Sequence, residues 1–201
     1  MNTLKLVLAS SSSPRKKILN HLGIPFISIS PNINEKPFPM EKISNLVQRL
    51  SKEKVIAVSS MIPKNKPFII LGCDQMAIID KEIIGKPYSY NQAFIQLKKI
   101  RGKCVKFYCG ICVFINTENY MKTSIEKTEV FFRKFSIKEI ELYLKQEKPY
   151  KCAGSFKSEG RGILLVNKIL GKDPNSLIGL PVLLLQKILL KKKINLLNFF
   201  L

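Results

Sequence analysis

The chain has 201 residues, 46% of them hydrophobic and 24% charged, which is typical of a globular protein with one sizeable core or two small lobes. Its five cysteines are odd in number and lack paired spacing, which argues against a disulfide framework and favours a reducing, cytoplasmic location. The 34 Lys and Arg residues against 14 Asp and Glu residues give a formal net charge of +20, which attracts polyanions.

Strands and helices alternate along the chain. In chain order, the patterns predict a strand over Leu4–Ala9, a helix over Pro14–Leu22, a strand over Phe26–Ser30, a helix over Ile43–Ser60, a strand within Ile69–Ile79, a helix over Asn91–Ile100, long strands over Lys103–Asn116 and Tyr120–Phe132 joined by a polar turn, a helix opened by the capping box Ser136–Glu139, and a last helix from near Pro181. No repeat, linker or domain boundary interrupts this order. We therefore expect an α/β fold with some antiparallel pairing, in a single domain over residues 1–201.

The two apolar ends and the cysteine pair have simple structural explanations. The start, "MNTLKLVLAS", lacks the length and cleavage pattern of a signal peptide. The leucine-rich end is interrupted by charged residues and is too short to span a bilayer, so we expect a core helix and no membrane association. "CGIC" at Cys109–Cys112 lies in an apolar strand, where residues three apart face opposite ways, so core packing is favoured over a redox or zinc site. The only histidine, His21, is expected on the surface of a helix.

One acidic residue, Asp74, stands in the apolar stretch "IILGCDQMAII". A carboxylate in the middle of a buried strand would cost several kcal/mol unless it were paired. We therefore expect Asp74 at the carboxyl end of its strand, where ligands bind in α/β sheets. Its position alone leaves a general base or metal ligand and a turn-capping Asp equally open.

A lysine also falls on an apolar face. Lys54 shares the helix face of Leu50 and Val58, so it either points inward toward an anionic partner or extends its ammonium to solvent. Two short loops, "GKP" at Gly85–Pro87 and "SEGRG" at Ser158–Gly162, carry charges on segments suited to contact a ligand.

The segment "SSSSPRKK" at Ser10–Lys17 follows the first strand and opens a helix. Hydroxyls, backbone N–H groups and cations at a helix N-terminus favour an anion site. It is not a Walker loop, because GxxxxGK[ST] occurs nowhere in the chain. Alone, the segment is a weak indication of phosphate binding.

These segments together resemble the successive motifs of the Maf-like nucleotide pyrophosphatases over nearly the whole chain. They are "LVLASSSSPRKKIL", "NEKP", "RLSKEKV", "LGCDQMAIID", "GKP", "EKTEVFF", "CAGSFKSEG" and "GKDPNSLIGLP". "DQ" at Asp74–Gln75 and "CAGSFKSEG" are similar to the branch acting on 7-methyl-GTP, whereas the dTTP/UTP branch has Thr after the Asp. The resemblance implies an elongated mixed sheet flanked by helices, in two lobes with a central cleft, and metal-assisted cleavage between the α and β phosphates.

The resemblance also implies roles for individual residues. Asp74 matches the proton acceptor. The residues matching phosphate-binding or other cleft positions are Ser10, Arg15, Glu35, Lys54 and Lys86, and those matching base-selecting positions are Pro14, Gln75 and Glu159. Glu35 and Asp74 are the candidate ligands of a divalent cation, Mg²⁺ or Mn²⁺, since hard ions suit an oxygen-lined site without histidine.

The chain departs from the family pattern around the base site. Ser13 stands at the family's Pro position, and Pro14 at the position that usually holds Trp or Arg. Asn34 replaces the Asp that usually precedes the Glu, and Arg161 lies near Glu159. The reaction is therefore better defined than the base preference.

We expect a nucleoside triphosphate pyrophosphatase with 7-methyl-GTP preference that releases a nucleoside monophosphate and pyrophosphate. Two alternatives stay open: a dTTP/UTP pyrophosphatase of the same family, and a basic nucleic-acid-binding module. The module would need clustered cations with exposed aromatics, but the lysines are scattered along the chain, so we expect no stable nucleic-acid partner. A homodimer is compatible with the sequence.

Overall fold

The computed structural model describes residues 4–63 and 65–200. Its strands are β1 (Lys5–Ala9), β2 (Phe26–Ile29), β3 (Phe68–Ile79), β4 (Glu82–Ile84), β5 (Cys104–Ile115), β6 (Tyr120–Phe132) and β7 (Val166–Leu170). Its α-helices are α1 (Ser13–His21), α2 (Ile43–Ser59), α3 (Tyr90–Ile100), α4 (Ile137–Glu147) and α5 (Val182–Leu190). Short 3₁₀ turns are η1 (Asn116–Glu118), η2 (Ala153–Ser155), η3 (Arg161–Leu165), η4 (Pro174–Ile178) and η5 (Leu196–Phe200).

The predicted α/β order is confirmed, because every expected helix and strand is present within a few residues of its expected bounds. The capping box is also confirmed: Ser136 Oγ accepts from the backbone N–H of Glu139 at 3.2 Å, and Glu139 Oε2 accepts from the backbone N–H of Ser136 at 2.6 Å. The short strands β4 and β7 are additions that the sequence patterns did not indicate.

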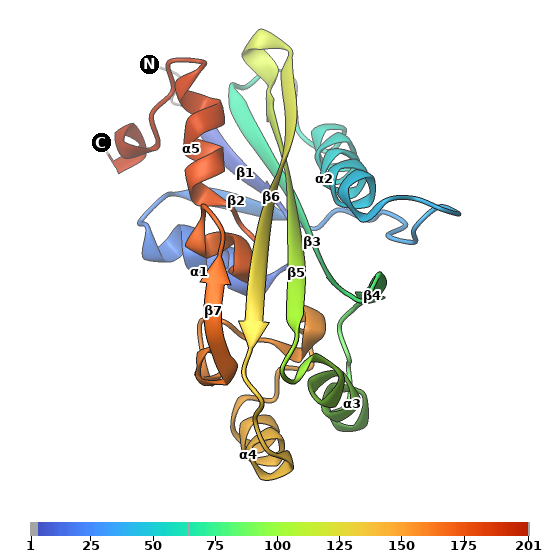
Figure 1. Cartoon of the computed structure of the whole chain (residues 1–201). Helices are drawn as coiled ribbons and strands as arrows, with labels where there is room; N and C mark the ends of the chain where they lie inside the picture. Colours follow the sequence, from blue (N-terminus) through green and yellow to red (C-terminus); the bar gives the residue numbers. More distant parts are fainter. Residues whose placement is uncertain (1–3, 64, 201) are drawn as a thin grey trace. The chain divides into compact units, whose positions relative to one another are not determined.

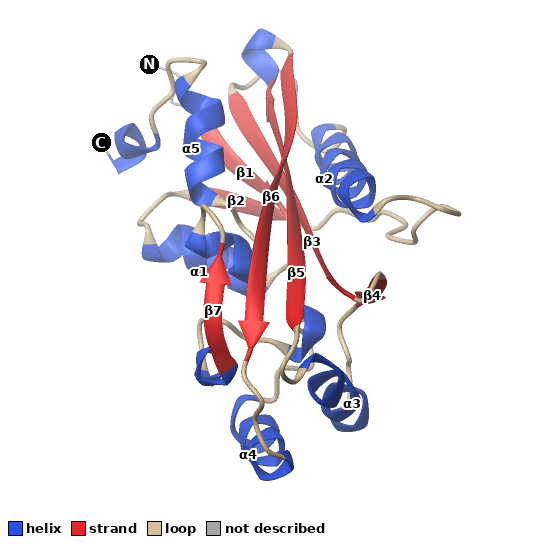
Figure 2. Cartoon of the chain, viewed as in Figure 1, coloured by secondary structure: helices blue, strands red, loops and turns tan. Residues whose placement is uncertain are grey.

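The strands form one mixed sheet in the order β2-β1-β3-β5-β6-β7, with β4 paired to β3. Strand β1 pairs in parallel with β2 and with β3, whereas β4 and β7 pair antiparallel with β3 and β6. Figure 2 shows the strands in red and the helices in blue. The predicted mixed sheet flanked by helices is thereby confirmed.

Contacts divide the chain into two compact units that alternate along the sequence. Unit 1 comprises Met1–Asp74, Cys109–Glu126 and Asp173–Leu201, and unit 2 comprises Gln75–Tyr108 and Lys127–Lys172. The chain passes from one unit to the other within strands β3, β5 and β6, and once more between β7 and η4. Each unit is therefore assembled from segments that are not consecutive in the sequence.

Unit 1 buries both faces of its part of the sheet. One core contains Leu6 and Leu8 of β1, with buried residues of α1 and α5. The other contains Val7 and Ala9 of the same strand, with buried residues of α2. Alternate residues of β1 therefore enter opposite cores, as the two-residue period of a strand requires. Helices α1 and α5 accordingly cover one face and α2 covers the other (Figure 1).

Unit 2 has an aromatic centre beneath α3 and α4. The Phe156 ring lies 5.1 Å from the Phe132 ring in an edge-to-face arrangement and 5.8 Å from the Phe107 ring. Helices α3 and α4 pack against each other and against turns η2 and η3 respectively (Figure 1). These contacts fix the segment between α4 and β7, which contains Glu159.

The cysteines and His21 have the predicted structural settings. Cys109 and Cys112 are buried in β5, and the described cysteines are free thiols. Burial raises the pKa of Cys112 to about 12, so this thiol is protonated and unreactive at neutral pH. His21 is exposed on the last turn of α1. No helix within residues 4–63 and 65–200 is long and apolar enough to cross a bilayer.

Candidate active site

The position of Asp74 differs from the prediction. β3 continues past this residue to Ile79, so Asp74 lies in the interior of the strand and not at its carboxyl end. Its side chain is buried. The expectation of a strand end was wrong because it assumed that an interior carboxylate would lack a partner, whereas the fold supplies one.

That partner is Lys54 on α2. Its Nζ lies 2.6 Å from Asp74 Oδ1 and 2.7 Å from Glu35 Oε1, and the Lys54 side chain is only 6% exposed. Of the two orientations that the sequence left open for Lys54, the structure shows the inward one and excludes extension to solvent. One ammonium thus holds two carboxylates together. Pairing with an opposite charge offsets the cost of removing these ions from water.

Glycine allows α2 to approach the sheet closely enough for this pair to form. A Cβ atom at Gly72 would lie 2.3 Å from the Ser51 carbonyl oxygen, and one at Gly110 would lie 2.3 Å from the Val47 carbonyl oxygen. Ser51 precedes Lys54 by about one turn of α2, and Gly72 shares the face of Asp74 on β3. These two close contacts therefore set the depth at which Lys54 meets Asp74.

The surroundings of Asp74 alter the proton affinity of its carboxyl group. Burial raises the pKa of its carboxyl group above the ordinary value, while Lys54 and Arg15 oppose this rise and Glu35 adds to it. Oδ1 accepts the hydrogen bond from Lys54, whereas Oδ2 is buried without a hydrogen-bond partner. A buried acceptor without a partner is costly, and a catalytic role or a bound ion is among the explanations for such an exception.

The start of α1 holds a second group of predicted site residues. Arg15 donates from Nε to the Gly179 carbonyl at 2.8 Å and from Nη1 to Ser10 Oγ at 3.0 Å. Ser10 Oγ also accepts from the backbone N–H of Ser12 at 3.1 Å, so its acceptor capacity is used while its proton remains available to donate. Pro14 lies in the first turn of α1 and is half-buried.

The Gly179 contact is a feature that the sequence did not reveal. Gly179 ends η4 with φ 105° and lies in "GKDPNSLIGLP", one of the segments that resemble the family motifs. The resemblance implied no role for this residue. Its carbonyl oxygen holds the guanidinium of a residue 164 positions away. The glycine after "PNSLI" indicates a turn, but the sequence pattern does not reveal a contact with a residue so distant in the chain.

The remaining predicted residues belong to unit 2. Gln75 is half-buried on β3, next to Asp74, while Lys86 and Glu159 are exposed on loops. Both Lys86 and Glu159 act electrostatically on the Cys152 thiol, whose pKa burial raises to about 11. The "GKP" and "CAGSFKSEG" loops are also joined by a hydrogen bond, since Gly154 N donates to the Gly85 carbonyl at 3.2 Å. Gln96 of α3 bridges them as well, because its Nε2 donates to the Gly85 carbonyl at 3.2 Å and its Oε1 accepts from Ser155 Oγ at 2.6 Å.

The donor set can be compared with the needs of a hard divalent cation. Within the described ranges, no three His, Cys, Asp or Glu side chains gather into a metal-binding group. Mg²⁺ typically takes only one or two protein carboxylates and completes its shell with water and substrate phosphates. Asp74 and Glu35, which share the Lys54 ammonium, supply that number of carboxylates.

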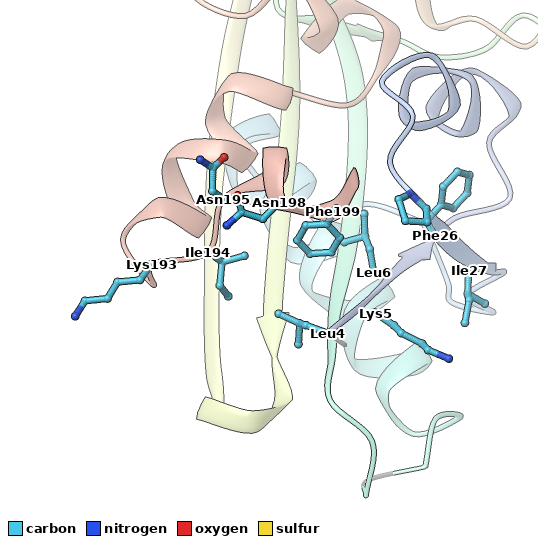
Figure 3. A pocket seen from close by; sticks show the side chains of 11 residues that line it. Leu4, Lys5, Leu6, Phe26, Ile27, Lys193, Ile194, Asn195, Asn198 and Phe199 are labelled. Atoms are coloured by element: carbon cyan, nitrogen blue, oxygen red, sulfur yellow. The ribbon is translucent and has the colours of Figure 1, made fainter. Parts of the chain in front are cut away.

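A separate pocket of about 630 Å³ lies elsewhere in unit 1. Leu6 and Phe26 line it near the starts of β1 and β2, together with Phe199 of η5, whereas Ser10 follows the other end of β1. Figure 3 shows its mostly apolar side chains, with Lys5 and Lys193 extending to opposite sides. It contains none of the predicted site residues, and most of the residues that line it are apolar.

The mixed α/β fold thus combines a buried lysine between two carboxylates with an arginine held at a helix N-terminus, a combination typical of proteins that bind anionic ligands. The chain belongs to the family described as Maf-like protein, whose sequence profile matches residues 5–192. The resemblance found in its motifs is thereby confirmed.

Three relatives match nearly the full length of the chain, and each is named 7-methyl-GTP pyrophosphatase. The protein from Vibrio parahaemolyticus is 42% identical and the match covers 96% of this chain and 97% of the relative. The protein from Colwellia psychrerythraea is 44% identical, with 96% and 94% covered, and that from Nitrosococcus oceani is 41% identical, with 92% and 91% covered.

A solved structure also overlaps part of the chain. It is a nucleoside-triphosphatase, dITP/XTP pyrophosphatase, from Mycobacterium abscessus, with 11% identity and a TM-score of 0.38 over 66% of this chain and 76% of the other. An overlap at this level carries no argument about function.

Proposed function

We propose that the protein hydrolyses the bond between the α and β phosphates of a nucleoside triphosphate, preferably 7-methyl-GTP, and releases a nucleoside monophosphate and pyrophosphate. The observation that carries the proposal is the buried Lys54–Asp74 pair with Asp74 Oδ2 unpartnered. The names of three relatives, each matched over more than nine-tenths of its length, support the same reaction and substrate.

Asp74 acts as the general base. Lys54 holds Oδ1, so Oδ2 is the atom that accepts a proton from the attacking water. The water oxygen forms a bond to the α-phosphorus, the bond from that phosphorus to the bridging oxygen breaks, and pyrophosphate leaves with the electron pair. A carboxyl pKa raised by burial makes Asp74 a stronger base than an ordinary aspartate.

The cations offset the charge of the phosphates. Lys54 donates to two carboxylates and keeps a third N–H for a phosphate oxygen. Arg15, oriented by Ser10 and Gly179, has further N–H groups beyond the two in use, and the Ser10 hydroxyl retains its proton. Fixed donors of this kind stabilise the charge that develops in the transition state. Lys86, on its exposed loop, supplies a further cation.

Glu35 and Asp74 are the residues that would hold a divalent cation, Mg²⁺ or Mn²⁺. Such an ion, when bound, supplies Lewis-acid polarisation of phosphate oxygens. Lys54 keeps the two carboxylates together at one point, so the pair exists before the ion arrives.

Base choice is assigned to Gln75, Glu159 and Pro14. A 7-methylated guanine carries positive charge on its imidazole ring, so the Glu159 carboxylate favours it over unmethylated guanine. Gln75 offers both a donor and an acceptor to a base edge. Pro14 supplies no aromatic face for stacking, so we expect the preference to be weaker than with Trp at this position.

The direct test is the release of pyrophosphate from 7-methyl-GTP, GTP, dTTP and UTP, with and without Mg²⁺ or Mn²⁺. We expect metal-dependent release of pyrophosphate and a monophosphate in equal amounts, fastest with 7-methyl-GTP. Faster turnover of dTTP or UTP would contradict the substrate assignment, and no pyrophosphate from any nucleotide would contradict the reaction.

A further inference from the structure

The charge of the loop that carries Glu159 is unfavourable for a cationic base when the loop is taken alone. The segment Lys157–Arg161 has the sequence KSEGR, so the single carboxylate of Glu159 is flanked by two cations. Its net charge is positive, and a positive loop would repel a positively charged base. The contacts of the 157–161 loop show how this charge is offset.

Glu147, the last residue of α4, binds both cations of the 157–161 loop. Its Oε2 accepts from Lys157 Nζ at 2.7 Å, and its Oε1 accepts from the backbone N–H of Arg161 at 2.9 Å and from Arg161 Nη1 at 3.4 Å. The Glu147 side chain is only 7% exposed. Lys157 foremost, followed by Arg161, holds the pKa of Glu147 below its ordinary value, so the carboxylate is ionised at neutral pH.

The 157–161 loop also closes tightly around this carboxylate. A Cβ atom at Gly160 would lie 2.9 Å from both Glu147 oxygens, so a side chain at this position would displace the Glu147 carboxylate. One turn earlier on α4, the Tyr143 hydroxyl accepts from the backbone N–H of Lys157 and donates to the Ser155 carbonyl, both at 3.0 Å. Residues four apart share a helix face, so α4 holds the start and the end of the loop from one face.

Glu159 is the acidic residue of the 157–161 loop, and its carboxylate is not used in holding the loop. It is exposed and forms no hydrogen bond or ion pair with the described residues, whereas both neighbouring cations are bound to Glu147. With Glu147 included, the charges of the loop cancel, and the cations are drawn toward α4. Glu159 is therefore the carboxylate that the loop offers to solvent or substrate.

We propose that Glu147 is a positioning residue for base selection: it neutralises Lys157 and Arg161 and fixes the 157–161 loop so that Glu159 can favour a positively charged base. This inference rests on the proposed function and deepens it. It assigns to Glu147 no contact with the substrate, and its effect is on the choice between a cationic and a neutral purine.

The test compares kcat/KM for 7-methyl-GTP and for GTP in Glu147→Gln. The amide keeps the shape and one acceptor but loses the charge. We expect the 7-methyl-GTP to GTP ratio to fall by about five-fold, in the range of a partly exposed ion pair, while kcat/KM for GTP changes less than about two-fold. Glu141→Gln, on the same helix and exposed, is the matched control and should leave the ratio unchanged. An unchanged ratio in Glu147→Gln, or equal losses with both substrates, would overturn the proposal.

Arg161→Ala gives an independent test with the opposite sign. Arg161 is 58% exposed at its side chain, so its removal should leave the fold intact even if Glu147→Gln does not fold. Loss of a cation beside Glu159 should raise the 7-methyl-GTP to GTP ratio, and a fall or no change would count against the proposal. If the wild-type protein releases pyrophosphate from neither nucleotide, the proposed function fails, which is distinct from a failure of the role of Glu147.

Discussion

The two groups of candidate site residues are built in different ways. Lys54 and Asp74 lie within α2 and β3, are buried, and are bonded directly to each other. Lys86 and Glu159 lie on short loops, are exposed, and are held through the backbone and through neighbouring side chains. Rigid elements place a reacting group more accurately than loops do, whereas loops accept changes of sequence more easily. Under the proposed function, we infer from this contrast that the chemical step belongs to unit 1 and much of the substrate choice to unit 2.

The largest expected effect is that of Asp74→Asn. The amide has the same shape but cannot accept the proton of the attacking water, and loss of a general base typically costs about 10²–10⁴-fold in rate. Pyrophosphate release from 7-methyl-GTP measures the loss, with circular dichroism to check the fold. Asp80→Asn, in an exposed turn after β3, is the matched control and should retain full activity. Near-normal turnover in a folded Asp74→Asn protein would show that Asp74 is not the general base.

Lys54→Met should lower the rate by about 10²-fold and change the pH profile, because a transition-state hydrogen-bond donor is removed. The ionised form of Asp74 is the active one, so activity falls as the pH drops through its folded pKa, which burial has already raised. Without Lys54, the foremost influence that lowers this pKa, the acidic limb of kcat/KM should move to higher pH. Lys191→Met, at the exposed C-cap of α5, should change neither the rate nor the acidic limb of the pH profile. Equal, salt-dependent losses in both variants would favour diffuse attraction of polyanions instead.

Gly72→Ala should destabilise the protein by about 1–3 kcal/mol, as overpacking of a tight core does. The added Cβ would meet the Ser51 carbonyl at 2.3 Å and push α2 away from β3, so Lys54 would also lose its contact with Asp74. The midpoint temperature of thermal unfolding and the turnover rate should therefore both decrease. Gly85→Ala is the stability control, since no atom lies within 4 Å of its added Cβ. A Gly72→Ala protein with normal stability would show that α2 is not held by this contact.

The smallest expected effect is that of Pro14→Trp. An indole stacked on the cationic ring of 7-methylguanine typically contributes roughly 0.5–2 kcal/mol, so the preference over GTP should rise several-fold. Pro14→Ala separates the gain of the ring from the loss of proline in the first turn of α1. Competition between 7-methyl-GTP and GTP measures the ratio, and an equal ratio in both variants would show that position 14 does not touch the base.

The regular elements of the fold and the place of Lys54 on the apolar face of α2 could be predicted because they depend on local periodicity. Leu50, Lys54 and Val58 share one helix face whatever the rest of the chain does. The partners of Lys54 could not be read in this way, since Glu35 and Asp74 meet it only when three segments fold together.

Other features escaped prediction for related reasons. Asp74 is interior because β3 continues to pair with β4 at Ala77–Ile79, which depends on a turn that the apolar pattern does not mark. Strand β7 is largely exposed and lacks the alternation that identifies a half-buried strand. The single domain over residues 1–201 and the central cleft implied by the family remain predictions.

The central claim is that the chemical step and the selection of the base depend on different residues. The most direct test is to measure kcat/KM for 7-methyl-GTP and GTP in two single variants, Asp74→Asn and Glu159→Gln. We predict that Asp74→Asn lowers both values by the same large factor and leaves their ratio unchanged, because every substrate needs the base. Glu159→Gln should lower the ratio while the value for GTP stays near that of the wild type. A change of ratio in Asp74→Asn, or an equal loss with both substrates in Glu159→Gln, would contradict the assignment of the reaction to the buried pair and of base choice to the 157–161 loop.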